Sequence, residues 1–494
     1  MESEKKQNDE LIEKQNDNEL YDEKDKIKAD DENEDDFKGY SKAAKFQLFG
    51  LFFLLGIINH LGTILVMTGG RLLAYELDMK DYVTIYTSVA TIFSVLTRII
   101  NSKLCLKVSY KKRVVIICFW MMAGYSTMFA VLQLHETVLS EQNVLCFVLS
   151  FIPCFFLGSS YAFGEAAMIA YLRLFPKTLI AGWSSGTGLS GLISGGLNFL
   201  SQMVDNLPLK YMYLILTPVG FLYLLFFIWT YRILKSQERH IEKVRRESMG
   251  HIPVDSTIEH EEDQKNDEEK KHEEEEDIKS IREEEKKEME NMNKANQTMS
   301  LENFSKVMSM VGRVIINLGS IYFLQFFCVN ALIVKVASKL DIGFLPLGCS
   351  DNHHPFRKGK FEFINLAYQI GMFTSKTFIK IVRRIQPIEV YTIVIGSMNI
   401  IYIIEYYTGF AAWYVLFVLG LILGFFSGGT YAGGFYTILN SDRVQKDYKE
   451  LTVNVATLFN DSGTFLSGIL GFLAIKFWIN SDEAFEGQEL DPTC

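Results

Sequence analysis

Apolar runs of about 20 residues recur along this chain, separated by short polar segments. An α-helix rises about 1.5 Å per residue, so a run of this length can cross a hydrocarbon core about 30 Å thick. A chain built from many such runs is expected to fold as an all-α, polytopic membrane protein. The eleven runs lie at roughly 46–68, 82–101, 113–133, 144–172, 178–203, 211–234, 311–337, 361–382, 388–407, 411–440 and 451–479.

Charged residues are concentrated outside these runs. The first 45 residues and a block from about 236 to 300 hold most of the acids and bases, including the stretches DDENEDD and HEEEED. Segments of this composition cannot bury a core and are expected to be disordered. The net charge of −10 arises mainly there, so it gives no support to a nucleic-acid partner.

The charged segments divide the chain into five expected parts. The second segment follows the sixth run, where a transporter made of two halves has its cytosolic linker. The parts are a disordered acidic cytosolic tail over 1–45, an N-terminal six-helix bundle over 46–235, a disordered charged cytosolic linker over 236–310, a C-terminal five-helix bundle over 311–480 and a short luminal tail over 481–494.

Lysine and arginine residues predict which side each loop occupies, because they are enriched in short cytosolic loops. With the N-terminus in the cytosol, the inside loops include the basic loop after the second run, with Lys111, Lys112 and Arg113. The four short inside loops then hold about 13 bases, against about seven in the outside segments. An odd number of spans places the C-terminal tail on the non-cytosolic side.

Two short stretches occur twice, in the same order, in the two halves of the chain. SGTGLSG at 185–191 matches SGTFLSG at 462–468, and YAFGE at 161–165 matches YAGGF at 431–435. The second copy comes six runs after the first, so both copies cross the membrane in the same direction. This indicates a parallel repeat, as in the two halves of major-facilitator transporters, with the second half one span short. The alternative is chance, because glycine and serine patterns are common in membrane helices.

The small residues of this repeat are expected to pack helices closely. Glycine lets two backbones approach, and hydroxyl groups form hydrogen bonds across the contact. The expected packing residues are Ser184, Ser185, Gly186, Thr187, Gly188, Ser462, Gly463 and Thr464.

Carboxylates inside the apolar runs are the strongest candidates for chemistry, because a charge at the centre of a membrane helix costs about 2.5–3.5 kcal/mol on insertion scales. Glu165 lies within the fourth run, and Asp461 lies about 15 Å into the eleventh, near the midplane. Each acid has two possible roles. The functional role is to carry a proton or to contact substrate in a central cavity, and the alternative role is purely structural. Arg98 and Lys335 are the expected partners of Glu165, whereas the structural alternative for Asp461 is hydrogen bonding between helices.

Other polar residues inside the runs extend this set. His60 either titrates in an acidic lumen or is a hydrogen-bonded packing residue. Gln369 and Lys376 are seven residues apart, so they share one face of the eighth helix and are expected to line a cavity. Snorkelling to lipid headgroups is the favoured alternative for Lys376. The expected substrate and proton pathway consists of Glu165, Asp461, Asn460, Asn59, His60, Gln325, Asn330, Gln369, Arg98, Lys335 and Lys376.

No pattern indicates an enzyme, a cofactor or a metal site. The chain has no HExxH motif and no P-loop. Cys349, His353 and His354 lack a second pair of ligands, so no metal is expected. A disulfide between Cys349 and Cys494 is an alternative to two free thiols, since both lie in segments expected on the non-cytosolic side. Five cysteines in or beside apolar runs are expected to be core residues: Cys105, Cys118, Cys146, Cys154 and Cys328.

Longer stretches of the chain resemble the battenin family of lysosomal membrane proteins. The resemblance implies a major-facilitator-like fold and a lysosomal or vacuolar membrane. It also implies export of small polar solutes, either glycerophosphodiesters or basic amino acids, with an effect on luminal pH. The stretches that carry it are LLGIINHLGTILVM (54–67), SSYAFGEAAMIAYLRLFPKTLIAGWSSGTGLSG (159–191), AYQIGMFTSK (367–376), GGTYAGGFYTI (428–438) and NDSGTFLSG (460–468).

One position departs from the family pattern. Members of the battenin family carry a glutamate in the seventh helix, where this chain has Gln325 in the stretch YFLQFF. If that carboxylate moves protons, the role is lost here or has shifted to Glu165 or Asp461.

The expected function is therefore a carrier that rocks two helix bundles around a midplane cavity, with protons coupled through Glu165 or Asp461. Its partners are a small polar solute and the lipid bilayer. Two alternatives stay open. One is a membrane scaffold or regulator that moves no solute and binds cytosolic proteins through 1–45 and 236–300. The other is an equilibrative nucleoside-type carrier, a class that also has 11 spans.

Overall fold

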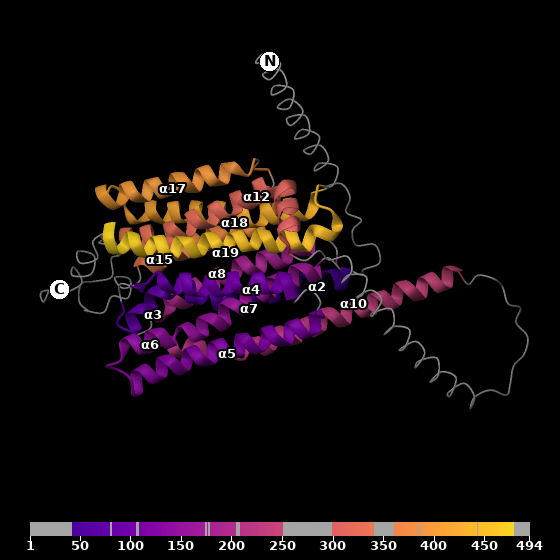
Figure 1. Cartoon of the computed structure of the whole chain (residues 1–494), viewed down its shortest axis with the longest axis horizontal. Coiled ribbons are helices and arrows are strands. Elements are labelled where there is room, and N and C mark those ends of the chain that lie inside the picture. The colour runs from indigo at the N-terminus through magenta and orange to yellow at the C-terminus, as the bar shows by residue number, and fades with distance from the viewer. Residues whose placement is uncertain are drawn as a thin grey trace, which may run out of the picture.

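The structure is a computed structural model of the whole chain. Most of its helices run side by side along the long axis, and α10 extends beyond the others at one end (Figure 1). The described residues are 42–79, 82–104, 108–172, 175, 178–203, 208–249, 299–339, 360–382, 384–385, 387–441 and 443–478.

The described residues are helical over almost their whole length. The first half contains α2 (Lys42–Thr68), α3 (Gly70–Glu76), α4 (Ile85–Leu104), α5 (Tyr110–Thr137), α6 (Asn143–Leu149), α7 (Phe151–Leu172), α8 (Leu179–Met203), α9 (Leu209–Leu216) and α10 (Val219–Met249). The second half contains α12 (Leu301–Phe327), η4 (Cys328–Ile333), α13 (Val334–Lys339), α15 (Lys360–Thr377), α16 (Ile379–Val382), α17 (Glu389–Thr408), α18 (Trp413–Asn440), η5 (Lys446–Tyr448), α19 (Lys449–Leu473) and η6 (Ala474–Trp478).

Each of the eleven apolar runs predicted from the sequence corresponds to a helical segment in the described residues. Eight of these segments are long and apolar enough by themselves to cross a membrane. The other three are α4, α8 and α15, which are helices of comparable length but lower hydropathy. Their polar residues are buried within the protein, so the same feature that lowers their hydropathy keeps those side chains away from lipid.

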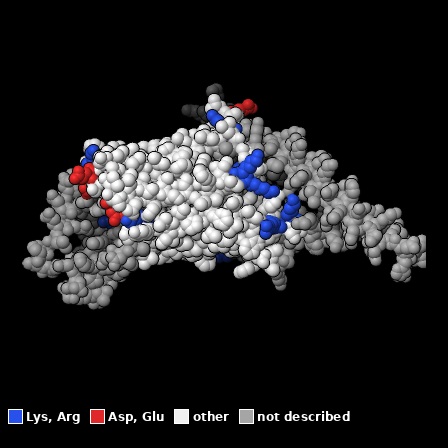
Figure 2. Space-filling model, turned by 90° about the horizontal axis from the view of Figure 1, so that it is seen from below, with Lys and Arg blue, Asp and Glu red and all other residues white. Residues whose placement is uncertain are grey.

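The two ends of the molecule carry the charged residues, and the wide surface between them carries hardly any on the face seen in Figure 2. We call the end where α2 begins the Lys42 end and the end where α2 stops the Thr68 end. The large exposed side chains of this lateral surface are apolar, such as Phe119, Trp229 and Ile400. An apolar belt between two polar ends is the surface of a membrane-spanning protein.

Each half of the chain has its own buried apolar contacts. One core cluster consists of residues between Leu48 and Leu234, and a second consists of residues between Ile321 and Leu423. Within the first half α2 packs on α8 and α5 on α7, and within the second α12 packs on α19 and α15 on α18. The two halves meet where α8 packs against α15 and α4 against α19.

The first glycine of the repeated stretch has the same role in both halves. Gly186 on α8 lies against the backbone carbonyl of Phe53 on α2, and Gly463 on α19 lies against the carbonyl of Gly319 on α12. In each case a Cβ atom would clash with backbone, which cannot move aside as a side chain can. The repeated stretch therefore packs the fifth and eleventh spans on the first helix of their own half.

The last glycine of the repeated stretch faces the opposite half. Gly191 lies against the Gln369 side chain on α15, and Gly468 lies against Ser88 on α4. Each copy of the stretch thus uses one glycine for its own half and one for the interface between halves. This equivalence supports a true repeat over a chance match, and it makes α8 and α19 the two helices around which the halves meet.

Replacing Gly186 with leucine is expected to lower the free energy of unfolding by at least about 1–3 kcal/mol, because the new side chain separates α8 from α2. Gly196→Leu is the matched control on the same helix, since nothing lies within 4 Å of a Cβ atom at Gly196. Apparent melting temperatures of the purified proteins in detergent measure both changes. Equal melting temperatures for the two variants would contradict the packing role.

The linker expected over 236–310 is helical at both of its described ends. α10 continues to Met249, because a helix already formed gains one hydrogen bond for each residue it adds. α12 begins at Leu301, where the Ser300 side chain accepts a hydrogen bond from the Asn303 N–H at 3.1 Å. Residues 1–41, 250–298, 340–359 and 479–494 lie outside the described residues, and with them Cys349, His353, His354 and Cys494.

Four of the five cysteines expected in the core are described, and all four are buried free thiols: Cys118, Cys146, Cys154 and Cys328. That prediction is confirmed for these four. Cys105 lies outside the described residues.

Candidate functional site

Three charged side chains from both halves of the chain meet in the interior. The Arg98 guanidinium on α4 donates a hydrogen bond from Nη2 to Glu165 Oε2 on α7 at 2.6 Å. Its Nε donates to Asp461 Oδ2 on α19, in the other half. Each of the three residues is at most 3% exposed. We call Arg98, Glu165 and Asp461 the ionic cluster; one cation there is paired with two anions.

A polar stripe on α4 positions Arg98. Residues on this stripe alternate at spacings of four and three, which keeps them on one face of a helix. Ser94 Oγ donates to the Gly158 carbonyl on α7 at 2.9 Å, and Asn101 Nδ2 donates to Asn454 Oδ1 on α19 at 3.4 Å. The stripe therefore lies between the two helices that supply the acids. Its buried members are Thr87, Thr91, Ser94, Arg98 and Asn101.

Glu165 contacts three helices besides its own. In addition to Arg98, its Oε1 accepts a hydrogen bond from the Tyr431 hydroxyl on α18 at 2.6 Å. His60 Nε2 on α2 lies 3.5 Å from the same oxygen, without hydrogen-bonding geometry. Glu165 is seven residues before the last residue of α7, so it lies about 10 Å inside the Lys42 end. Because its hydrogen bonds come from α4 in the first half and α18 in the second, this carboxylate is sensitive to relative movement of the two halves.

Two tyrosines at equivalent positions of the repeat each lie against a buried cation. The Arg98 guanidinium carbon is 5.4 Å from the centre of the Tyr161 ring, and Lys376 Nζ is 4.3 Å from the centre of the Tyr431 ring. Tyr161 and Tyr431 begin the matched stretches YAFGE and YAGGF. Arg98 on the second span and Lys376 on the eighth are therefore equivalent cations of the two halves.

Lys376 is buried inside the protein. It is 4% exposed, and its Nζ lies 3.2 Å from Thr187 Oγ1 on α8. The expected snorkelling to lipid headgroups is wrong, because α8 approaches α15 closely where Gly188 lies beside the Lys376 side chain. Among the residues that the structure describes, no carboxylate forms an ion pair with Lys376.

Further candidates surround the ionic cluster. Asn59 Nδ2 donates to the Tyr161 carbonyl at 3.2 Å, and the His60 ring makes edge contacts with Tyr161 and Trp183. Asn460 is buried beside Asp461, and its Oδ1 has no hydrogen-bond partner among the described residues. The structure therefore brings the expected residues of the first, second, fourth and eleventh spans together.

The remaining pathway candidates lie at other contacts. Asn330 Nδ2 on η4 donates to Thr87 Oγ1 on α4 at 3.1 Å, which joins the two halves away from the ionic cluster. Gln369 packs on α8 at Gly191, and Gln325 is buried on α12. Lys335 is buried on α13, which follows η4.

The expected packing residues are mostly buried, with one exception. Ser184, Ser185, Thr187 and Thr464 are buried. Ser462 is exposed, because it occupies the face of α19 that points away from the neighbouring helices. The expectation that Ser462 packs helices is therefore wrong.

Ion pairs also join the halves near both ends. At the Thr68 end, Arg71 Nη1 on α3 lies 3.3 Å from Glu362 Oε2 on α15. At the Lys42 end, Arg113 Nη1 on α5 lies 3.7 Å from Glu450 Oε1 on α19. The interface between halves thus has charged contacts near each end and the ionic cluster between them.

Sequence reasoning missed Tyr161 and Tyr431. Both belong to the repeated stretches, where the small residues gave the basis for the packing prediction. A tyrosine in an apolar helix is usually a core residue, so neither tyrosine was predicted to contact a cation. The signal that identifies them is their equivalence: the same tyrosine stands in both copies at the position that meets a buried cation.

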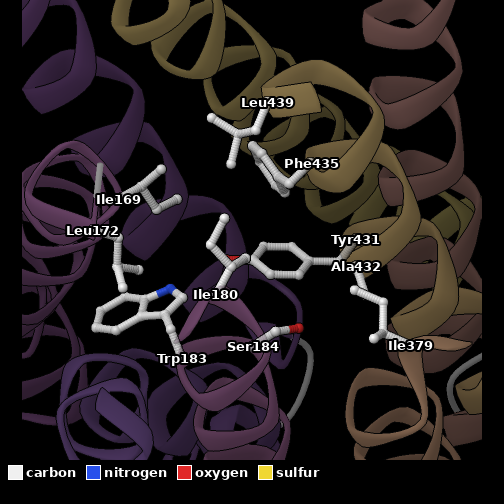
Figure 3. A pocket seen from close by; sticks show the side chains of 10 residues that line it. All are labelled: Ile169, Leu172, Ile180, Trp183, Ser184, Ile379, Tyr431, Ala432, Phe435 and Leu439. Carbon is white, nitrogen blue, oxygen red and sulfur yellow. The ribbon is translucent and has the colours of Figure 1, made fainter. Parts of the chain in front are cut away.

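A small pocket lies in the part of the molecule near the Lys42 end, between α7, α8, α16 and α18 (Figure 3). Tyr431 separates this pocket from the ionic cluster, since its ring lines the pocket while its hydroxyl holds Glu165. The pocket is lined by Ile169, Leu172, Ile180, Trp183, Ser184, Ile379, Tyr431, Ala432, Phe435 and Leu439.

Comparison with known proteins identifies the family. The sequence profile of the family described as "CLN3 protein" matches residues 50–479. The chain belongs to this family. It is 24% identical to "Battenin" of Dictyostelium discoideum over 445 residues, which covers 90% of this chain and 96% of the relative. It is 21% identical to "Protein BTN1" of Saccharomyces cerevisiae over 334 residues, covering 66% of this chain and 74% of that one.

The fold of this CLN3-family chain resembles that of major-facilitator transporters. A solved structure described as "D-xylose-proton symporter" matches with a TM-score of 0.51 at 11% identity, covering 88% of this chain and 91% of the other. At this identity the likeness concerns the fold alone. The predicted battenin-family resemblance and the all-helical, major-facilitator-like fold are confirmed, and the chain is a multi-pass membrane protein of this family.

Proposed function

We propose that this CLN3-family protein is a carrier of the battenin type that moves a small polar solute across a lysosomal or vacuolar membrane by alternating access. The solute is a glycerophosphodiester or a basic amino acid, and protons are coupled through Glu165 or Asp461, so transport affects luminal pH. The N-terminus and the Lys42 end face the cytosol, and the Thr68 end faces the lumen.

The observation that carries this proposal is the ionic cluster, in which Arg98 and Glu165 from one half meet Asp461 from the other. Buried ion pairs are weak stabilisers, and apolar residues of similar size often replace them without loss of stability. In a membrane protein such charges are retained mainly where they mark a substrate or ion pathway. Charges shared between two halves can change partners when the halves move.

The packing around the cluster supports alternating access. The halves meet through α4, α8, α15 and α19, whose contacts include glycine and serine residues that allow helices to slide. The ion pairs near the two ends are suited to closing one end while the other opens, because each joins one residue of the first half to one of the second.

The orientation is supported by charge. The loops at the Lys42 end carry Lys103, Lys111 and Lys112, and few acids accompany them. Lysine-rich short loops favour the cytosol. This orientation makes the pocket of Figure 3 accessible from the cytosolic side.

Transport by the purified protein in liposomes tests the proposal. We expect saturable uptake of labelled glycerophosphocholine or labelled arginine, stimulated by an imposed pH gradient, because both solutes are small and polar. Protein-free liposomes and liposomes with labelled uridine are the controls. Absence of uptake of the first two solutes by protein shown to be folded would contradict the proposal and favour a scaffold, whereas uridine uptake alone would favour a nucleoside carrier.

A further inference from the structure

We propose that Lys376, with Ser184 and Trp183, forms a binding subsite for the anionic group of the transported solute, a phosphate or a carboxylate. This inference rests on the proposed function, because it assigns part of the solute-binding site of the carrier. It follows from comparing the two halves position by position.

The first half supplies a complete arrangement. Arg98 lies against the Tyr161 ring and is paired with Asp461, which comes from the repeated stretch of the other half. Asp461 is the residue directly before SGTFLSG in the sequence. The complete arrangement is therefore a cation, a tyrosine ring and a carboxylate placed just before the repeated stretch.

The second half has the same arrangement without the carboxylate. Lys376 lies against the Tyr431 ring and close to Thr187 within the other copy of the stretch. The position equivalent to Asp461 is Ser184, directly before SGTGLSG. Where Arg98 has an acid, Lys376 has a hydroxyl. This buried ammonium therefore makes no direct ion pair with a described carboxylate, and the Glu165 charge acts on it only at longer range.

An unpaired ammonium in a dry interior is costly, so a site that retains one is suited to a ligand that brings the missing charge. Lys376 has three N–H donors, and its one hydrogen-bond partner among the described residues is the Thr187 hydroxyl. An anionic group of a ligand would occupy the space that corresponds to the Asp461 carboxylate and would form charge-assisted hydrogen bonds there.

Two further donors lie one and two residues before the repeated stretch of α8 and have no partner among the described residues. The Ser184 hydroxyl and the Trp183 indole N–H are both buried and make no hydrogen bond to any described residue. Both residues line the pocket, where Figure 3 shows the Ser184 hydroxyl directed toward Ile379 and the Trp183 nitrogen on the side of the indole ring that faces Ile180. A buried ammonium with one hydrogen bond, together with two buried donors that lack acceptors, favours an anion over a cation as the ligand.

The site is reached from the pocket once Tyr431 moves. In this structure the Tyr431 ring covers Lys376, and its hydroxyl is held by Glu165. Ligand and tyrosine ring therefore compete for the same cation. This arrangement places the anion subsite next to the ionic cluster and separates the two by a single side chain.

Two variants test the subsite in opposite ways. Lys376→Met removes the cation and also the cost of burying it, so the protein is expected to fold. Ser184→Asp restores the missing carboxylate, which pairs with Lys376 as Asp461 pairs with Arg98, and is expected to occupy the subsite permanently. Lys210→Met is the matched control, because Lys210 pairs with Glu136 far from the site.

The measurement is ligand-induced thermal stabilisation of each purified full-length variant, titrated with inorganic phosphate, glycerophosphocholine and arginine, with glycerol as the uncharged probe. Phosphate, glycerophosphocholine and arginine each carry an anionic group, and we call them the anionic probes for that group and not for their net charge. We expect the wild type and Lys210→Met to be stabilised by at least one anionic probe and not by glycerol. Apparent affinity is expected to fall about 30-fold or more in both Lys376→Met and Ser184→Asp. The probe that stabilises the wild type most strongly then shows whether the subsite binds free phosphate, a phosphodiester or the carboxylate of an amino acid.

Two results would overturn the subsite: equal affinities in all four proteins, or no stabilisation of the wild type by any anionic probe. Uptake in liposomes separates this failure from failure of the proposed function. Anion binding that depends on Lys376 without uptake would refute transport and leave the subsite standing. Uptake that is unchanged in Lys376→Met and Ser184→Asp would refute the subsite and leave transport standing.

Discussion

Arg98→Gln is expected to destabilise the protein by about 3–5 kcal/mol, a larger effect than any other single change considered for this chain. Arg98 is the one cation paired with both Glu165 and Asp461 among the described residues, and all three are buried. Without it, two buried carboxylates remain and neither is paired with an arginine or lysine among the described residues. The apparent melting temperature in detergent and the yield of monodisperse protein measure the loss.

Two comparisons make this prediction specific. The triple variant Arg98→Gln, Glu165→Gln, Asp461→Asn removes all three charges, so it is expected to recover much of the lost melting temperature. Arg313→Gln is the matched control, because Arg313 is 76% exposed and its pair with Glu389 is worth about 0–1 kcal/mol. An unchanged melting temperature in Arg98→Gln alone would show that the carboxylates do not depend on this arginine.

The spans and the repeat were predictable from sequence because both depend on local patterns. A run of about 20 apolar residues predicts a membrane helix without knowledge of its neighbours. The repeated stretch that contains Gly186 in one half and Gly463 in the other predicts close packing, because a glycine lets two helix backbones approach wherever it lies at their contact. The pairing of Glu165 with Arg98 was also among the expected alternatives.

The pairing of Arg98 with Asp461 could not be predicted in the same way. The two residues are 363 positions apart and belong to different halves. Only the packing of α4 on α19 brings them together, and no local pattern states which helices of two bundles face each other. The burial of Lys376 could not be predicted for a related reason. Its position near the end of its own helix favours exposure to lipid headgroups, whereas its burial results from contacts with Thr187 on α8 and Tyr431 on α18.

Glu165→Gln is expected to abolish the stimulation of uptake by a pH gradient while leaving the protein folded. The cluster holds two anions and one cation, so removing the Glu165 charge leaves Arg98 balanced by Asp461 alone. The stability effect should therefore be small, in contrast to Arg98→Gln. Coupling between proton and solute should fall by about 5- to 150-fold, because the variant side chain cannot exchange a proton.

The contacts of Glu165 explain why this acid, rather than Asp461, is expected to link protons to solute. Its charge is faced by Arg98 and His60 from the first half and by the Tyr431 hydroxyl from the second. Tyr431 also covers Lys376, so protonation of Glu165 weakens the hold on the side chain that must move when solute enters. Asp461 has no such contact with Tyr431 among the described hydrogen bonds.

Uptake driven by a pH gradient in liposomes, compared with exchange of labelled for unlabelled solute at equal pH, separates coupling from transport. Glu165→Gln should lose the first and keep a measurable part of the second. Asp461→Asn is the first control, because it removes the same amount of charge from the ionic cluster. Glu405→Gln is the second control, because Glu405 is a buried glutamate outside the cluster whose carboxylate accepts a hydrogen bond from the Ala411 N–H at 2.9 Å. Full gradient-driven uptake in Glu165→Gln together with its loss in Asp461→Asn would move the proton site to α19.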